Sequence, residues 1–229
     1  MKRVFPILAG LTVALLGYAL YEALVAAPTE QTMGAVQRIF YYHVPSAWTS
    51  FVFFAMNFVA SIVYLLRRNP KADAVALASA ELGVVFCSVV LVTGPIWARP
   101  VWGIWWTWDW RLTSTLVMWL IYISYLVLRR FSSGGQTPVL AAALAVFGAL
   151  DIPLVYFSIW FFRTQHPQPV IGDQGSIDPR MLHALLVNWA AFLCFGFLVF
   201  WVRYRLEVMQ QEIDETEALE ALLESGNSR

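Results

Sequence analysis

Long apolar stretches alternate with short polar connections along most of the chain. Each stretch has roughly the 20 apolar residues that a helix needs to cross the hydrocarbon core of a bilayer. The alternation therefore predicts an all-α, polytopic membrane protein with six transmembrane helices. The predicted spans cover approximately residues 4–27, 45–66, 74–95, 112–130, 138–161 and 181–203.

Positively charged residues indicate the orientation of these spans. Lys and Arg favour the cytoplasmic ends of transmembrane helices, and here they gather at alternate ends of the predicted spans. Both termini are then cytoplasmic, and the connections at 28–44, 96–111 and 162–180 lie on the outer face. The first stretch also has features of a signal peptide. It is longer than the roughly 7–15 apolar residues of such a segment, so we expect an uncleaved span.

Composition agrees with a membrane protein and leaves little chain for a soluble domain. Hydrophobic residues make up 59% and charged residues 13% of the 229 residues, and 15 basic side chains balance 15 acidic ones. No basic stripe indicates nucleic-acid binding. We expect a membrane domain over residues 1–205 and an acidic cytoplasmic helical tail over 206–229. The tail is either a solvated extension of the last helix or a docking surface.

The segment WGIWWTWDWRLT, which starts at Trp102, carries five tryptophans within nine positions. If residues 102–110 form a helix, Trp102, Trp105, Trp106 and Asp109 share one face at the i, i+3, i+4, i+7 spacing. Gly103 weakens that helix. The pattern predicts a stripe of indole rings along the membrane surface, where such rings are favoured.

An aromatic belt at the membrane–water interface is the competing interpretation of this segment. A belt accounts well for the scattered Trp48, Trp97, Trp160 and Trp201. It does not account for five tryptophans in nine positions. The density therefore favours a surface that covers a flat apolar ligand.

All three histidines of the chain lie on or beside the predicted outer face. His43 precedes Pro45 at the start of the second span, His166 follows the fifth span, and His183 lies one turn into the sixth. A single histidine at such an interface is more often an amphipathic anchor. Haem, however, is a flat apolar macrocycle whose iron accepts imidazoles on both faces and whose propionates are anionic. An aromatic shelf with histidines on separate arms fits that ligand.

Charged residues bracket the tryptophan segment. Arg99 and Arg111 can form forked hydrogen bonds to propionates. Equally, Asp109 can cap the fourth span while Arg111 extends toward lipid headgroups. Ionisable residues inside spans usually face a partner or a cavity. Glu22, Glu81 and Asp151 fall within or near the predicted spans, so we expect each of them to do so.

The tryptophan segment, taken as about residues 97–113, resembles the WWD signature of haem-handling proteins in cytochrome c biogenesis. A short chain with six spans and one such segment is similar to the cytochrome c maturation protein C (CcmC) family rather than to the larger haem lyases. The resemblance extends over most of the chain through RIFYYHVPSAW, VTGPIWARPVWG and IPLVYFSIWFFRTQHPQ.

The resemblance implies that b-type haem is held non-covalently and transiently at the periplasmic face of the bacterial inner membrane. It implies His43, in YHVPSA, and His166 as the axial ligands of the haem iron. His166 lies in RTQHPQ, where the family has an NTLHQ-like sequence, and His183 matches no ligand motif. The other implied haem-binding residues are Trp102, Gly103, Trp105, Trp106, Trp108, Asp109, Arg111 and Arg99.

The resemblance further implies delivery of haem to the haem chaperone CcmE, with the small membrane protein CcmD and the ABC transporter subunits CcmA and CcmB as partners. The sequence has no GxxxxGK[ST] motif, so any ATP dependence must come from a partner. Such a chain is an assembly factor and not an enzyme.

Two alternatives stay open. One is a transmembrane haem exporter that moves haem from the cytoplasm through its own spans. The other is a bis-histidine redox cytochrome, which would carry its ligands within the spans, whereas the candidate ligands here are in loops.

Overall fold

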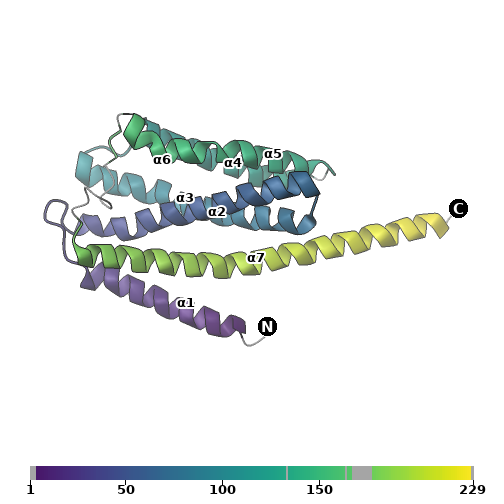
Figure 1. Cartoon of the computed structure of the whole chain (residues 1–229), viewed down its shortest axis with the longest axis horizontal. Coiled ribbons are helices and arrows are strands. Elements are labelled where there is room, and N and C mark those ends of the chain that lie inside the picture. The colour runs from purple at the N-terminus through teal and green to yellow at the C-terminus, as the bar shows by residue number, and fades with distance from the viewer. Residues whose placement is uncertain (1–3, 133, 163, 167–176, 228–229) are drawn as a thin grey trace.

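The computed structural model describes residues 4–132, 134–162, 164–166 and 177–227. In these ranges the chain is a bundle of long helices (Figure 1). Six helical segments among them are long and apolar enough to cross a membrane, which confirms the predicted all-α fold with six spans. The elements are α1 (Val4–Tyr21), the π-helix η1 (Glu22–Ala26), the 3-10 helix η2 (Ala35–Ile39), α2 (Phe40–Arg67), α3 (Pro70–Trp102), α4 (Trp110–Phe131), α5 (Thr137–Ala149), α6 (Asp151–Phe161) and α7 (Pro179–Asn227).

The second span begins earlier than the sequence predicted. α2 starts at Phe40, directly after η2, so Pro45 lies inside the helix rather than in its first turn. A proline at this position lacks the N–H that would bond to the carbonyl of Tyr41. Phe40 and Tyr41 are still held in the helix because both are buried in a cluster with Leu185 of α7. The prediction that His43 lies in a loop was therefore wrong, because His43 belongs to α2.

The fifth span consists of two helices. α5 ends at Ala149 and α6 begins at Asp151, with Leu150 between them. Pro153 has no N–H to donate to the carbonyl of Ala149, and its fixed φ suits the first turn of a new helix. Atom Oδ2 of Asp151 is buried and has no hydrogen-bond partner among the described residues. The carboxyl group as a whole is not isolated, because it interacts with the backbone of Met118 on α4.

Helices α2 and α3 form the centre of the bundle. In Figure 1, α4, α5 and α6 lie on one side of this pair, and α7 followed by α1 lies on the other. Gly83 of α3 lies against the ring of Phe54 on α2, and a Cβ at Gly196 of α7 would lie 2.6 Å from the ring of Phe53. These glycines let the helix backbones approach closely, as small residues do in membrane bundles.

Charged residues of the spans pair at the end of the bundle opposite the tryptophan segment. Arg129 Nη1 lies 2.6 Å from Asp73 Oδ1, and Arg129 Nη2 lies 3.6 Å from Glu207. Arg203 donates two hydrogen bonds to Glu81, at 2.6 and 2.7 Å. Glu81 therefore has the partner that an ionisable residue within a span requires.

Helix α7 continues beyond the bundle as one helix as far as Asn227 (Figure 1). The part of the predicted tail that the structure describes is thus helical. Its side chains Leu219, Leu222 and Leu223 are exposed. Both interpretations of the tail, a solvated extension and a docking surface, are compatible with that exposure.

Candidate functional site

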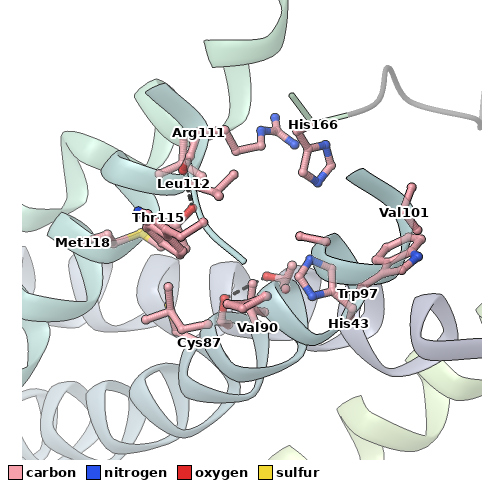
Figure 2. A pocket seen from close by; sticks show the side chains of 18 of the residues that line it. His43, Cys87, Val90, Trp97, Val101, Arg111, Leu112, Thr115, Met118 and His166 are labelled. Atoms are coloured by element: carbon pink, nitrogen blue, oxygen red, sulfur yellow. Dashed lines mark hydrogen bonds between the residues drawn. The ribbon is translucent and has the colours of Figure 1, made fainter. Parts of the chain in front are cut away.

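A pocket lies at the end of the bundle where α3 ends and α4 begins (Figure 2). Its lining is mostly apolar and comes from α2, α3, α4, α6 and three connecting segments. Figure 2 shows the rings of His43 and His166 on different sides of this space, with Arg111 beside His166. The predicted site residues that the pocket brings together are His43, Trp102, Trp106, Arg111 and His166.

His43 enters the pocket from α2 and is held by α3. Its side chain is only 8% exposed. Nδ1 lies 2.9 Å from the hydroxyl oxygen of Thr93, and the ring of Trp97 meets the imidazole edge-on at 5.8 Å between ring centroids. The imidazole is therefore fixed by a hydrogen bond and by packing.

Helix α3 is shaped around this imidazole by glycine and proline. A Cβ added at Gly94 would lie 3.5 Å from Cε1 of His43, which is an ordinary van der Waals distance, so this turn of α3 packs directly beside the ring. Pro95 and Pro100 follow within the helix, and each removes one backbone hydrogen bond from the last turns. This last part of α3 supplies much of the pocket wall, including Trp97 and Trp102.

The tryptophan segment is not helical, so the prediction of a helix over 102–110 was wrong. α3 ends at Trp102 because Gly103 adopts a left-handed conformation with φ 79°, and its N–H bonds to the carbonyl of Arg99. Left-handed glycine is a common helix terminator. The guanidinium of Arg99 also donates to the carbonyl of Gly103. The next helix begins only after Asp109.

This irregular backbone separates the tryptophans into two groups. Trp102 and Trp106 line the pocket. Trp105 and Trp108 are 59% and 77% exposed and lie outside it. The single indole face expected from helical spacing is therefore absent from this segment.

Asp109 connects the tryptophan segment with the segment that carries His166. Its Oδ1 accepts the backbone N–H of Leu112 at 2.9 Å and so caps α4, as the sequence allowed. Its Oδ2 accepts the backbone N–H of Gln165 at 2.9 Å. Trp110 adds a second attachment by stacking on Phe162, with 4.3 Å between ring centroids.

Arg111 is directed across the protein rather than toward lipid headgroups. Its Nη2 donates to the carbonyl of Tyr156 at 2.7 Å, and its Nε donates to the hydroxyl of Ser158 at 3.3 Å, both on α6. A guanidinium has five N–H donors. Those that α6 does not use are available to an anionic group in the pocket.

Two indole N–H groups of the pocket are buried without a partner in the described part of the chain. They belong to Trp97 and Trp106. Buried donors are normally satisfied, so an exception asks for an explanation such as a ligand. The sequence interpretation missed Trp97, which was assigned to the aromatic belt. Its position one turn after Gly94, within VTGPIW, was the available signal.

Met33 also lines the pocket, from the connection between η1 and α2. The carboxylate of Glu30 accepts the backbone N–H groups of Thr32 and Met33 and so holds this turn. These hydrogen bonds, chiefly the one from Met33, lower the pKa of Glu30 below its ordinary value. Nothing in the sequence pattern had indicated Met33.

Several predicted residues lie outside the pocket: Arg99, Gly103, Trp105, Trp108 and Asp109. His183 is also elsewhere, on α7, where its Nε2 lies 3.4 Å from the hydroxyl of Tyr18 and 3.9 Å from a carboxylate oxygen of Glu22. Glu22 thus has a nearby polar group. The separation of His183 from the pocket agrees with its lack of a ligand motif.

Tightly packed aromatic residues lie deeper in the bundle, close to the pocket. Met118 borders the pocket and belongs to the same buried cluster as Phe54, Tyr122 and Tyr125. Phe54 and Tyr122 stack with 3.9 Å between ring centroids. The described helices are therefore filled with side chains at this depth.

The chain matches the sequence profile of the family described as "Heme exporter protein C" (CcmC) over residues 1–219. The chain belongs to the CcmC family. A "Heme exporter protein C" of Bradyrhizobium diazoefficiens is 34% identical over 222 residues, covering 96% of this chain and 84% of the relative. A "Putative cytochrome c biosynthesis ccmC-like mitochondrial protein" of Arabidopsis thaliana is 35% identical over 217 residues, with coverages of 94% and 83%. A "Heme exporter protein C" of Escherichia coli K12 is 36% identical over 174 residues, with coverages of 76% and 69%.

The resemblance to CcmC proteins that the sequence motifs indicated is thus confirmed. In this CcmC-family chain, each of the four motifs behind the resemblance supplies at least one pocket residue. They are His43 from RIFYYHVPSAW, Trp97 from VTGPIWARPVWG, Trp106 from the WWD segment and His166 from RTQHPQ.

Proposed function

We propose that this chain binds haem in the pocket, with His43 and His166 as the axial ligands of the iron, and delivers it to the haem chaperone CcmE. The pocket faces the periplasm of a bacterial inner membrane in this proposal. Membership of the CcmC family supports a role in haem handling for cytochrome c biogenesis. The observation that carries the proposal is that His43 and His166 line one apolar pocket.

The lining residues fit the chemistry of haem. Two imidazoles can occupy both axial positions of the iron, and an apolar wall suits the macrocycle. The anionic propionates need donors at one edge. The unpartnered N–H groups of Trp97 and Trp106 and the remaining donors of Arg111 supply them. Haem bound in this way is b-type and non-covalent.

The size of the pocket supports transient holding. Its volume is about 230 Å³, which is below the roughly 300–1,000 Å³ of pockets that enclose drug-sized ligands. A porphyrin therefore extends out of it. The exposed indoles of Trp105 and Trp108 offer the projecting edge an aromatic surface. An accessible edge is what a receiving chaperone requires.

The absorption spectrum of the purified protein tests this proposal. Replacing His43 or His166 with alanine should abolish or greatly weaken the haem bands, because each change removes one axial ligand. Replacing His183 with alanine is the matched control and should leave the bands nearly unchanged. Unaltered bands in either ligand variant would reject that histidine as a ligand. Loss of the bands in the His183 variant would mean that the second ligand is misassigned.

Transport of haem through the spans is the second candidate, because relatives carry the name "Heme exporter protein C". The packed side chains of Phe54 and Tyr122 argue against an open path through the bundle. Vesicles containing the purified chain and loaded with haem distinguish the two functions. Haem release from vesicles without CcmE would favour transport. Release only to added CcmE would favour delivery.

The remaining partners follow from the same proposal. CcmD is expected to associate with the chain in the membrane, and the ABC transporter subunits CcmA and CcmB are expected to supply the ATP dependence. Transfer of haem from the chain to CcmE in detergent should therefore proceed in the absence of ATP. ATP and the transporter subunits should affect only the later release of loaded CcmE.

A further inference from the structure

The geometry points to Thr93 as a positioning residue that fixes the tautomer of His43, so that Nε2 is the nitrogen presented to the haem iron. This inference rests on the proposed function and extends it to a residue that does not line the pocket. Thr93 lies on α3 and His43 on α2, and their side chains meet in a hydrogen bond.

The hydroxyl of Thr93 can act only as an acceptor toward His43. Its oxygen lies 2.7 Å from the carbonyl oxygen of Val89, one turn earlier in the same helix. Two oxygens at that distance repel each other unless a proton lies between them, and a carbonyl has no proton to give. The hydroxyl proton therefore points at Val89, and the lone pairs of the hydroxyl oxygen face His43.

The proton of the neutral imidazole must then be on Nδ1. Nδ1 lies 2.9 Å from the Thr93 oxygen, where two facing lone pairs would repel. A neutral imidazole carries one N–H and one acceptor nitrogen. A proton on Nδ1 leaves the lone pair of Nε2 free for a metal. A hydrogen-bond acceptor at the ring nitrogen that does not bind the metal also orients a ligating imidazole and increases its basicity.

Packing keeps the imidazole in this orientation. The ring is buried, and Trp97 lies against its edge. Gly94, the residue after Thr93, lies beside Cε1. One short stretch of α3 thus supplies the acceptor and part of the packing around the ring.

Nuclear magnetic resonance of haem-free protein with ¹⁵N-labelled histidine measures the tautomer directly, and the His43 signals are identified by their loss in His43→Ala. At a pH where His43 is neutral, the unchanged protein should show a proton on Nδ1. Thr93→Val keeps the β-branched shape but removes the acceptor, so the proton should shift toward Nε2. Thr93→Ser should restore the Nδ1 form. A proton on Nε2 in the unchanged protein, or the same tautomer in Thr93→Val, would overturn the inference.

Haem titration provides the second readout. Thr93→Val should weaken haem binding by about 10-fold or more, as the loss of such a supporting partner does. The same change should raise the midpoint potential of the iron, because a less basic imidazole stabilises the ferric state less. Thr93→Ser should return both values close to those of the unchanged protein. The matched control is Thr12→Val, since Thr12 makes the same hydrogen bond to the carbonyl one turn earlier, at 2.8 Å, but lies in α1. It should change neither value.

The two proposals fail in different ways. If the tautomer depends on Thr93 but the protein binds no haem, the proposed function is wrong while the tautomer assignment stands. If haem binds through His43 with an affinity and a potential that do not depend on Thr93, the inference alone is wrong.

Discussion

Asp109 accepts a hydrogen bond of 2.9 Å from the backbone N–H of Gln165, which is 56 positions later in the chain. The same carboxylate caps α4 through the N–H of Leu112. One side chain therefore begins a helix and fixes the residue next to His166. The aspartate of the WWD segment acts on the neighbouring segment and does not line the pocket itself.

Asparagine at position 109 should separate these two roles. Its single carbonyl oxygen caps a helix about as well as aspartate, but its NH₂ group cannot accept a hydrogen bond from Gln165. We expect Asp109→Asn to unfold at nearly the temperature of the unchanged protein in detergent and to bind haem more weakly. Asp109→Ala should bind weakly and also lose about 1 kcal/mol of stability with the cap. A normal haem titration for Asp109→Asn would show that the Gln165 hydrogen bond does not position His166.

Phenylalanine at position 106 should reveal whether the indole N–H recognises a propionate. Trp106→Phe keeps an aromatic ring but removes the donor that has no partner among the described residues. A hydrogen bond to a charged group contributes about 1.5 kcal/mol or more, which is roughly 10-fold in affinity. We expect that loss in titrations with haem and little loss with haem whose propionates are esterified. An equal loss for both ligands would assign Trp106 to ring packing alone.

Leucine at positions 105 and 108 should affect transfer more than binding. Trp105 and Trp108 are exposed and lie outside the pocket, so their replacement leaves the enclosed contacts intact. We expect the double variant to hold haem with a nearly normal spectrum while its rate of haem transfer to CcmE falls. A matched double variant with leucine at Trp102 and Trp106 should lose the spectrum itself. Normal transfer by the first variant would show that the exposed indoles take no part in the transfer of haem to CcmE.

The ion pair between Asp73 and Arg129 should be important for stability. Their side chains are only 9% and 10% exposed, at 2.6 Å, and removal of one partner of a buried pair costs about 3 kcal/mol or more. We expect Asp73→Asn to unfold in detergent at a clearly lower temperature. The control is Glu81→Gln, whose pair with Arg203 is about one-third exposed and should contribute about 1 kcal/mol or less. Equal destabilisation by the two changes would contradict this ranking.

The histidines show how much of the candidate site could be predicted from the chain. Motif matching selected His43 and His166 and set His183 aside, and the first two line the pocket while the third does not. Helical spacing failed for the tryptophan segment, because it treated Gly103 as a weakness within a helix. Gly103 instead adopts φ 79° and ends α3. Trp97 was missed because an indole near the membrane surface looks the same in sequence whether it faces lipid or a pocket.

The six spans follow from the order of apolar and polar residues, because lipid cannot satisfy backbone polar groups and a long apolar stretch must therefore satisfy them within its own helix. That requirement is local and can be read along the chain. The contacts of Asp109 with Gln165, and of Thr93 with His43, join residues far apart in sequence. They depend on where α3 ends and α4 begins and on how closely α2 packs against α3. These contacts arise from the packing of whole helices, and a local pattern of residues does not specify that packing.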